Sequence, residues 1–168
     1  MEYEIRFERL GSRPLAVVRR CARSHELSTV VPEACGTVWN LIRSEQIPGA
    51  GRQIAVYLDD RINLEVGVEL GAPLTGSVEL ISSATPSGPV ATTTHYGPYG
   101  LMHQAHEAIL RWCGENGHTF AGPSWEIYGH WKEEWNSDPS KITTDIYYLL
   151  IDDGGSTAEP GAAADGGA

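Results

Sequence analysis

The chain has 168 residues and a formal net charge of −10, with 41% hydrophobic and 20% charged residues. This length and composition suit one compact globular domain and exclude a largely disordered chain. The 22 acidic residues against 12 basic ones argue against nucleic-acid binding, which needs Lys and Arg to displace counterions. The charge favours a neutral or positively charged ligand over a phosphate backbone.

The sequence lacks signals for export or for a membrane. No apolar run approaches the roughly 18 residues that a membrane span needs. The acidic N-terminus lacks the basic-then-apolar pattern of a signal peptide. The three cysteines, Cys21, Cys35 and Cys113, show no CxxC spacing and are expected to be reduced thiols. We therefore expect a cytoplasmic protein, a monomer or homodimer, that needs no cofactor and binds no membrane.

Residues 152–168 contain no aromatic or large aliphatic side chain. Such a segment cannot bury enough apolar surface to offset the entropy lost on ordering, so we expect a disordered acidic tail. It carries four acidic residues and no basic residue, which leaves a net charge of −6 on residues 1–151. Most of the acidity therefore belongs to the folded body.

The elements of the first half alternate between two periodicities. A helix is predicted from Pro32, which suits a first turn, with apolar residues following at steps of three and four. The sequence Ile-Pro-Gly-Ala-Gly at 47–51 ends it. Patterns of period two predict strands over residues 2–9, 14–22, 53–59 and 62–70, and a short linking strand over 76–82.

The second half repeats this order, with strands over 89–97, 124–131 and 143–151 and a helix over 99–116. Trp39 precedes Tyr57 by 18 residues, and Trp112 precedes Tyr128 by 16. We therefore expect two strand-helix-strand-strand repeats, about 12–72 and 88–151, within one domain over 1–151. They predict an α+β fold with a pseudo-twofold axis, antiparallel sheets flanked by two main helices, and a central ligand cleft.

The predicted strand SWEIYGHW presents two different faces, because alternate side chains of a strand point to opposite sides. One face is apolar, with Trp125 and Ile127, and is expected to pack against a helix. The other carries Glu126 and Tyr128. That face points either to solvent or to a lined pocket, and both interpretations stay open.

The strand over 62–70 carries a second candidate carboxylate, Glu65, on the face opposite its apolar side chains. Gly67 on that face leaves room for a ligand to approach the sheet. We expect Tyr57, on the neighbouring strand, to stand beside Glu65. The alternative is an ordinary amphipathic strand with no ligand.

The remaining motifs do not predict a metal site, a nucleotide site or a serine-hydrolase site. His103 and His106 lie three residues apart on the predicted helix, but no third ligand has recognisable spacing, so a solvated helix face is favoured and no metal site is predicted. His95 stands at a strand-to-helix junction, where it is expected to hydrogen-bond the turn. The sequence contains no P-loop, no GxSxG motif and no complete dinucleotide fingerprint.

The segment HYGPYGLMHQAHEAILRWCGENGHTFAGPSWEIYGHW resembles the second half of GyrI-like small-molecule-binding domains. The family pattern is a strand ending in H-x-G-P-Y, a helix with a late Trp, Gly-Pro and then E-x-Y. The matching residues are His95, Gly97, Pro98, Tyr99, Trp112, Gly122, Pro123, Glu126 and Tyr128. The earlier segment YLDDRINLEVGVEL resembles the family's Tyr-x-Asp and E-x-G-V strand pair. The resemblance spans about residues 3–151.

This resemblance implies the fold of the effector-binding domain of multidrug-sensing transcription regulators, in which a buried glutamate attracts lipophilic cations between aromatic rings. Here that glutamate would be Glu126. Because strand signal begins by Tyr3, we expect a stand-alone member without a helix-turn-helix domain. Glu65 and Glu126 are expected to act from opposite walls of the cleft. The candidate ligand-binding residues are Glu126, Tyr128, Glu65, Tyr57, Trp39, His95 and Tyr147.

Three functions follow as hypotheses. The first is a binder of bulky lipophilic, cationic or planar aromatic compounds, held by the carboxylate and by cation–π contacts. The second is a hydrolase that opens the cyclopropane ring of DNA-alkylating antibiotics, with Glu126 as general acid or base and Tyr128 polarising a carbonyl. The third is a gyrase-inhibitor-like interaction protein that uses its acidic surface.

Overall fold

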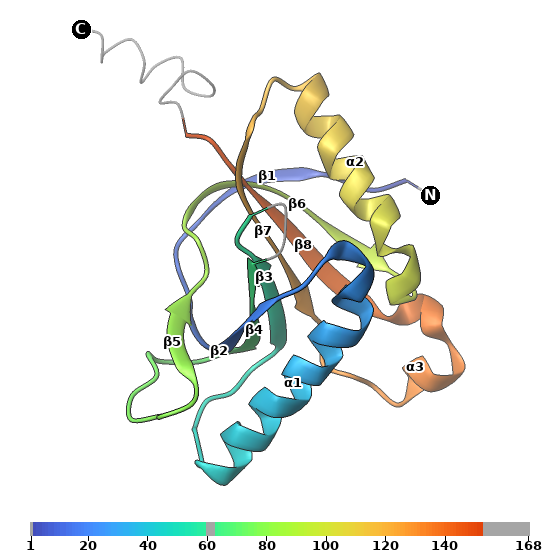
Figure 1. Cartoon of the computed structure of the whole chain (residues 1–168). Helices are drawn as coiled ribbons and strands as arrows, with labels where there is room; N and C mark the ends of the chain where they lie inside the picture. Colours follow the sequence, from blue (N-terminus) through green and yellow to red (C-terminus); the bar gives the residue numbers. More distant parts are fainter. Residues whose placement is uncertain (1, 60–62, 153–168) are drawn as a thin grey trace, which may run out of the picture.

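The structure is a computed structural model that describes residues 2–59 and 63–152 (Figure 1). The predicted tail, from residue 153 onward, lies outside the described residues. Within the described part, no helix is long and apolar enough to cross a membrane.

The described chain contains eight strands. They are β1 (Arg6–Leu10), β2 (Pro14–Cys21), β3 (Gln53–Tyr57), β4 (Asn63–Glu69), β5 (Ile81–Ala84), β6 (Gly88–Tyr96), β7 (Phe120–Tyr128) and β8 (Thr143–Leu150). The helices are α1 (Leu27–Ser44), α2 (Met102–Glu115) and the short α3 (Glu134–Ser137). Single 3₁₀ turns precede α1 and α2, η1 (Ser24–Glu26) and η2 (Tyr99–Leu101), and η3 (Pro139–Lys141) precedes β8.

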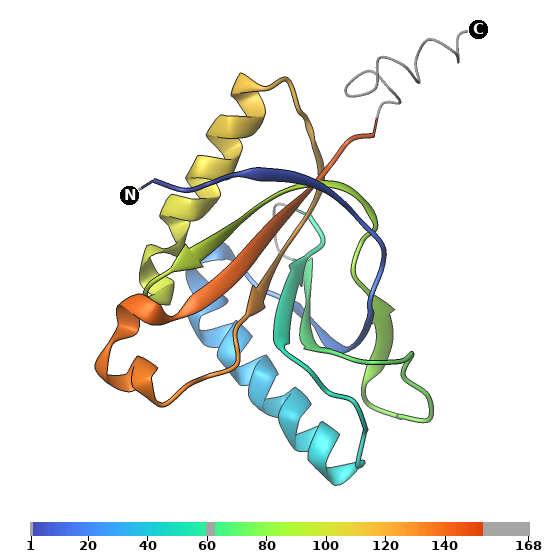
Figure 2. The same cartoon turned by 180° about the vertical axis from the view of Figure 1, so that it is seen from behind.

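The strands form one antiparallel sheet in the order β1-β6-β8-β7-β3-β4-β2-β5. Helices α1 and α2 lie on the same side of this sheet, as Figures 1 and 2 show from opposite directions. Helix α1 contacts β2 and β4, whereas α2 contacts β6 and β8. The predicted α+β class with two main helices is confirmed. The two helices cover the flanking strands, so the central pair, β7 and β3, lies between them.

The helix-facing side of the sheet holds two apolar clusters. Helix α1 buries Ala34, Cys35, Val38 and Ile42, the stripe at steps of three and four that the sequence predicts. Helix α2 buries Ala105, Ile109 and Cys113 against β6 and β8. Each helix therefore stabilises its own end of the sheet through hydrophobic burial.

The opposite side of the sheet has a third cluster, formed by strands alone. Trp125 and Ile127 belong to it, with Val56 from β3. Leu10 from β1 and Ile81 from β5 also pack against it, although these strands end the sheet at opposite edges. The sheet must therefore curve around this core. The prediction that Trp125 and Ile127 pack against a helix is wrong, because β7 presents its other face to α1 and α2.

The start of α1 and the position of β5 also differ from the prediction. Helix α1 begins at Leu27, five residues before Pro32. A proline at that point leaves the Ser28 carbonyl without a helical partner, but Ser28 and Pro32 are both exposed, so the carbonyl can bond water. The linking strand predicted over 76–82 is instead β5, at Ile81–Ala84, where it pairs with β2.

Gly67 on β4 leaves no space for a ligand, contrary to the prediction. A methyl group added there would overlap the carbonyl oxygen of Ala16 and come within 2.7 Å of Val17 Cα. Both are backbone atoms of β2, the neighbouring strand. The glycine is therefore needed for the close approach of two strands.

We expect Gly67→Ala to lower the free energy of unfolding by about 2 kcal/mol or more, because the backbone of β2 must shift. The control is Gly36→Ala on α1, where an added methyl group meets nothing within 4 Å. That change should raise stability by about 0.5–1 kcal/mol through helix propensity. Urea denaturation of the two variants measures both effects, and equal stabilities would contradict the strand-packing explanation.

Candidate functional site

Glu126 lies at the centre of the helix-facing side of the sheet. Its cross-strand neighbours are Ala55 on β3 and Ile146 on β8. Ala55 belongs to the apolar cluster under α1 and Ile146 to the cluster under α2. Glu126 therefore occupies the row where the two halves meet, and it is only 5% exposed. The structure therefore excludes the interpretation in which Glu126 points to solvent.

Both carboxylate oxygens of Glu126 accept hydrogen bonds. The hydroxyl of Tyr128 donates to Oε1 at 2.6 Å, and that of Tyr57 approaches the same oxygen at 3.4 Å. His106 Nε2, from α2, lies 2.7 Å from Oε2. The other ring nitrogen of His106, Nδ1, lies 2.6 Å from the hydroxyl of Tyr148 on β8. These protein groups supply the hydrogen bonds that water would otherwise give to the carboxylate.

The strand register explains why two tyrosines reach one oxygen. Ala55 pairs with Glu126, and Tyr57 and Tyr128 each follow two residues later on their own antiparallel strands. Both tyrosines therefore share a face with the Ala55–Glu126 pair and flank it on opposite sides.

Burial keeps these phenols protonated. It raises the pKa of Tyr57 and Tyr128, and the negative charge of Glu126 raises both further. The same two causes, with a contribution from Cys113, raise the pKa of Tyr148 to about 12. All three hydroxyls are therefore neutral near pH 7 and can donate hydrogen bonds.

Helix α1 and the turn before α2 complete the surroundings. Tyr99 in η2 contacts Tyr128 edge to face, with ring centroids 5.8 Å apart. Trp39 on α1 is half-buried and packs with Tyr57 and Tyr128 against the cluster under α1. Aromatic rings from α1, η2, β3 and β7 thus gather on the face that carries Glu126.

The other buried carboxylates are already paired with arginines. Arg19 Nε lies 3.0 Å from Glu65 Oε2. Glu69 has Arg52 at 3.0 Å and Arg13 at 3.3 Å. Among the described residues, His106 is the one ion-pair partner that Glu126 has. Among the buried carboxylates of the described residues, Glu126 is therefore the one without an arginine or lysine ion-pair partner.

Glu65 and Tyr147 lie on the far side of the sheet from Glu126. Glu65 pairs with Val56, and Val56 pairs with Trp125, so all three side chains point away from the helices. Tyr147 stacks on Trp125 with centroids 5.3 Å apart. The expectation that Glu65 and Glu126 form opposite walls of one cleft is wrong. Tyr57 stands beside Glu126 rather than Glu65, because a shift of one residue along a strand changes the face.

His95 is fully buried, and both of its ring nitrogens have partners. Tyr3 Oη lies 2.8 Å from Nδ1, and the carbonyl oxygen of Pro98 lies 3.0 Å from Nε2. Its position agrees with the expected bond to the turn at the strand-to-helix junction. These contacts leave it no ring nitrogen for a ligand.

His106 and its partner Tyr148 are residues of the candidate site that were not predicted from the sequence. Only His103 has the exposed position predicted for both histidines, whereas the His106 side chain is 22% exposed and faces Glu126. The available signal was helical spacing, because His106 adjoins Ala105 and lies three residues before Ile109, both in the buried stripe. No group of three metal-ligating side chains occurs in the described residues.

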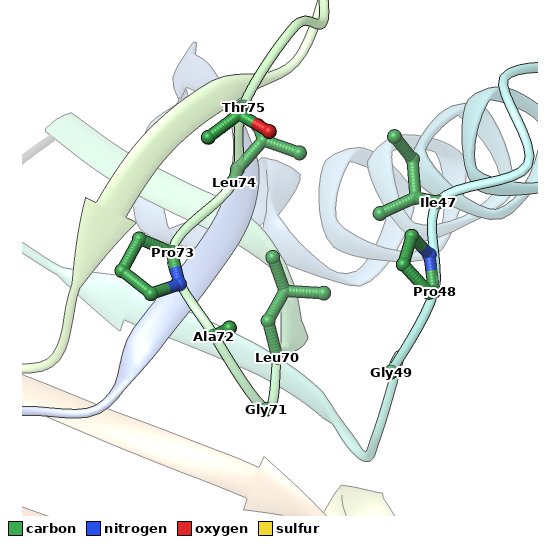
Figure 3. A pocket seen from close by; sticks show the side chains of 9 residues that line it. All are labelled: Ile47, Pro48, Gly49, Leu70, Gly71, Ala72, Pro73, Leu74 and Thr75. Carbon is green, nitrogen blue, oxygen red and sulfur yellow. The ribbon is translucent and has the colours of Figure 1, made fainter.

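A separate cavity of about 230 Å³ lies at the C-terminal end of α1 (Figure 3). Its lining comes from two loops, residues 47–49 and 70–75, with apolar side chains such as Ile47, Leu70 and Leu74. The lining contains neither a charged nor an aromatic side chain. We therefore take the cluster around Glu126 as the candidate site.

No protein-family model matches the sequence, and a search of curated proteins finds no significant relative. The C-terminal domain of EcmrR has a similar structure, with a TM-score of 0.71 at 16% identity over 90% of this chain and 99% of that domain. SAV2435 bound to tetraphenylphosphonium gives 0.66 at 14% identity over 90% and 94% of the two chains. A hydrolase from Listeria innocua gives 0.58 at 10% identity over 88% and 92%. The chain has the fold that its resemblance to GyrI-like domains implied.

Removing the hydroxyl of Tyr128 should destabilise the protein more than removing that of Tyr57. Tyr128→Phe deletes a 2.6 Å bond to a buried carboxylate and should lower the free energy of unfolding by about 1.5–3 kcal/mol. Tyr57→Phe, the matched control, deletes a 3.4 Å contact and should cost less than about 1 kcal/mol. Urea denaturation at pH 7 compares them, and the reverse order would contradict the geometry.

Proposed function

We propose that this chain is a small-molecule-binding protein that holds bulky lipophilic aromatic cations at Glu126. The observation that carries the proposal is the buried carboxylate without an arginine or lysine partner among the described residues. Most buried carboxylates are paired, because burial of an isolated charge is costly. Glu65 and Glu69 follow that rule with arginines, whereas Glu126 offers its charge to a ligand.

The surroundings of Glu126 suit a delocalised cation. Such a cation is weakly hydrated, so it enters an apolar site at less cost than an ammonium ion. The Tyr57 and Tyr128 hydroxyls contact the carboxylate, and the Tyr99 ring packs against that of Tyr128. Each ring face that a cation meets adds roughly 0.5–2 kcal/mol. Charge attraction to Glu126 and ring contacts would then act on the same molecule. SAV2435, which shares the fold, is bound to the lipophilic cation tetraphenylphosphonium.

We expect Glu126→Gln to weaken tetraphenylphosphonium binding by about ten- to hundredfold, because one buried charge is lost while the shape of the site is kept. Isothermal titration calorimetry measures the affinity of each variant.

Glu65→Gln is the matched control, since it removes a buried carboxylate from the far face of the same sheet. It should leave the affinity within about twofold of wild type. Thermal melting confirms that both variants fold. A wild-type protein without micromolar affinity for any lipophilic cation would refute the proposal, and an equal loss in both variants would place the ligand elsewhere.

A second candidate, a hydrolase for strained cyclopropane rings, is favoured by the 2.7 Å contact between His106 Nε2 and Glu126 Oε2. This pair can accept a proton from a water molecule. The water oxygen would bond to a ring carbon as the ring C–C bond breaks, and the electron pair would pass to a conjugated carbonyl. Tyr128 would donate a proton to that oxygen and regain one from the solvent. The product is the substrate plus one water.

The hydrolase candidate predicts that incubation with a cyclopropane-bearing dienone yields a product heavier by one water, detected by mass spectrometry. Glu126→Gln should slow this reaction by about a hundredfold or more, because general acid–base catalysis contributes about 10²–10⁴-fold. An unchanged rate in that variant would remove the mechanism. The interaction-protein hypothesis stays a prediction from the acidic charge.

A further inference from the structure

His106 is the basic side chain that contacts Glu126 in the described chain. It lies on α2 and reaches across to β7 and β8. We propose that His106 selects the charge of the ligand: neutral, it leaves Glu126 available to a cation, and protonated, it takes the place of that cation. This inference rests on the proposed binding function and adds to it a residue that couples ligand charge to pH.

The hydrogen bonds around His106 suit both of its protonation states. With a neutral ring, Nε2–H donates to Glu126 and Nδ1 accepts from the hydroxyl of Tyr148. With a protonated ring, both nitrogens donate, and the Tyr148 oxygen accepts while its proton turns elsewhere. A hydroxyl can change between these roles by rotation, so neither state leaves a ring nitrogen without a partner.

The titratable groups that face the His106–Glu126 pair come from several elements. Glu126 is met by Tyr57 on β3 and Tyr128 on β7, and His106 by Tyr148 on β8. Cys35 on α1 lies within electrostatic reach of Tyr57 and Tyr128, but burial raises its pKa to about 11. With these phenols and this thiol neutral, the remaining side chain in contact with Glu126 is a histidine, the residue type that ordinarily changes charge between pH 5 and 8.

The sign of the effect follows from the net charge of the pair. A neutral His106 with an ionised Glu126 carries a charge of −1, which attracts a cation. A protonated His106 brings the pair to zero, so a cation must displace the imidazolium or wait for it to lose its proton. Cation affinity therefore rises with pH, and binding releases a proton. A neutral aromatic ligand should show little of this dependence.

The test measures tetraphenylphosphonium affinity at several pH values in wild type, in His106→Gln and in His103→Gln. His103→Gln is the matched control, because His103 lies one turn earlier on α2 but is exposed. In wild type and in this control, affinity should fall by about tenfold from about pH 8 to about pH 5.5. In His106→Gln, which still donates to Glu126 but does not titrate, it should change by less than about twofold. Neutral triphenylphosphine oxide is the ligand control.

A second readout separates this role from a structural one. Calorimetry of tetraphenylphosphonium binding in two buffers of different ionisation enthalpy should show net proton release near pH 6 in wild type and none in His106→Gln. The proposal is overturned if His106→Gln binds the cation with the wild-type pH profile, or if triphenylphosphine oxide shows the same profile. Absence of binding to wild type at every pH would instead refute the proposed function, and this inference with it.

Discussion

The site depends on one constraint, the hydrogen bonding of a carboxylate that the fold removes from water. Glu126 lies between two helices in the row that joins the two halves of the sheet. An ionised carboxylate is stable in such a place only when other groups replace its hydration. Tyr128 and Tyr57 serve one oxygen and His106 the other. These donors come from a helix and two strands, so the carboxylate also ties these elements together.

The topology accounts for the place of this carboxylate. The order β6-β8-β7 continues as β3-β4-β2, so each half presents to the other the strand that follows its main helix in the chain. Each main helix covers the two strands of its half that are farther from the junction. The central strands β7 and β3 therefore keep a face between the helices, and that face carries Ala55 and Glu126 as direct neighbours.

The buried acidic residues on the two faces of the sheet have different partners. On the far face, Glu65 forms an ion pair with Arg19, and Glu69 forms ion pairs with Arg52 and Arg13. These salt bridges link neighbouring parts of the structure. On the helix-facing side, the partner of Glu126 is a histidine, whose charge depends on pH. An arginine keeps its charge, so Glu65 and Glu69 have permanently charged partners, whereas Glu126 does not. This difference, rather than the overall acidity, directs the proposed function to Glu126.

The class of the fold and most strand positions could be predicted from the sequence, which also pointed to Glu126 as a candidate site residue. These follow from local information, since periodicity is set by the geometry of single elements and since the motif around Glu126 is contiguous. Which face of each strand meets the helices depends on tertiary packing and could not be predicted from the sequence. Alternation shows that Glu126 and Trp125 point apart, but the pairing of Ala55 with Glu126 is what turns Glu126 toward α1 and α2. The same register places Glu65 on the far face, whereas the packing of α2 on the sheet brings His106 to Glu126. Such contacts between distant segments cannot be predicted from any short stretch of sequence.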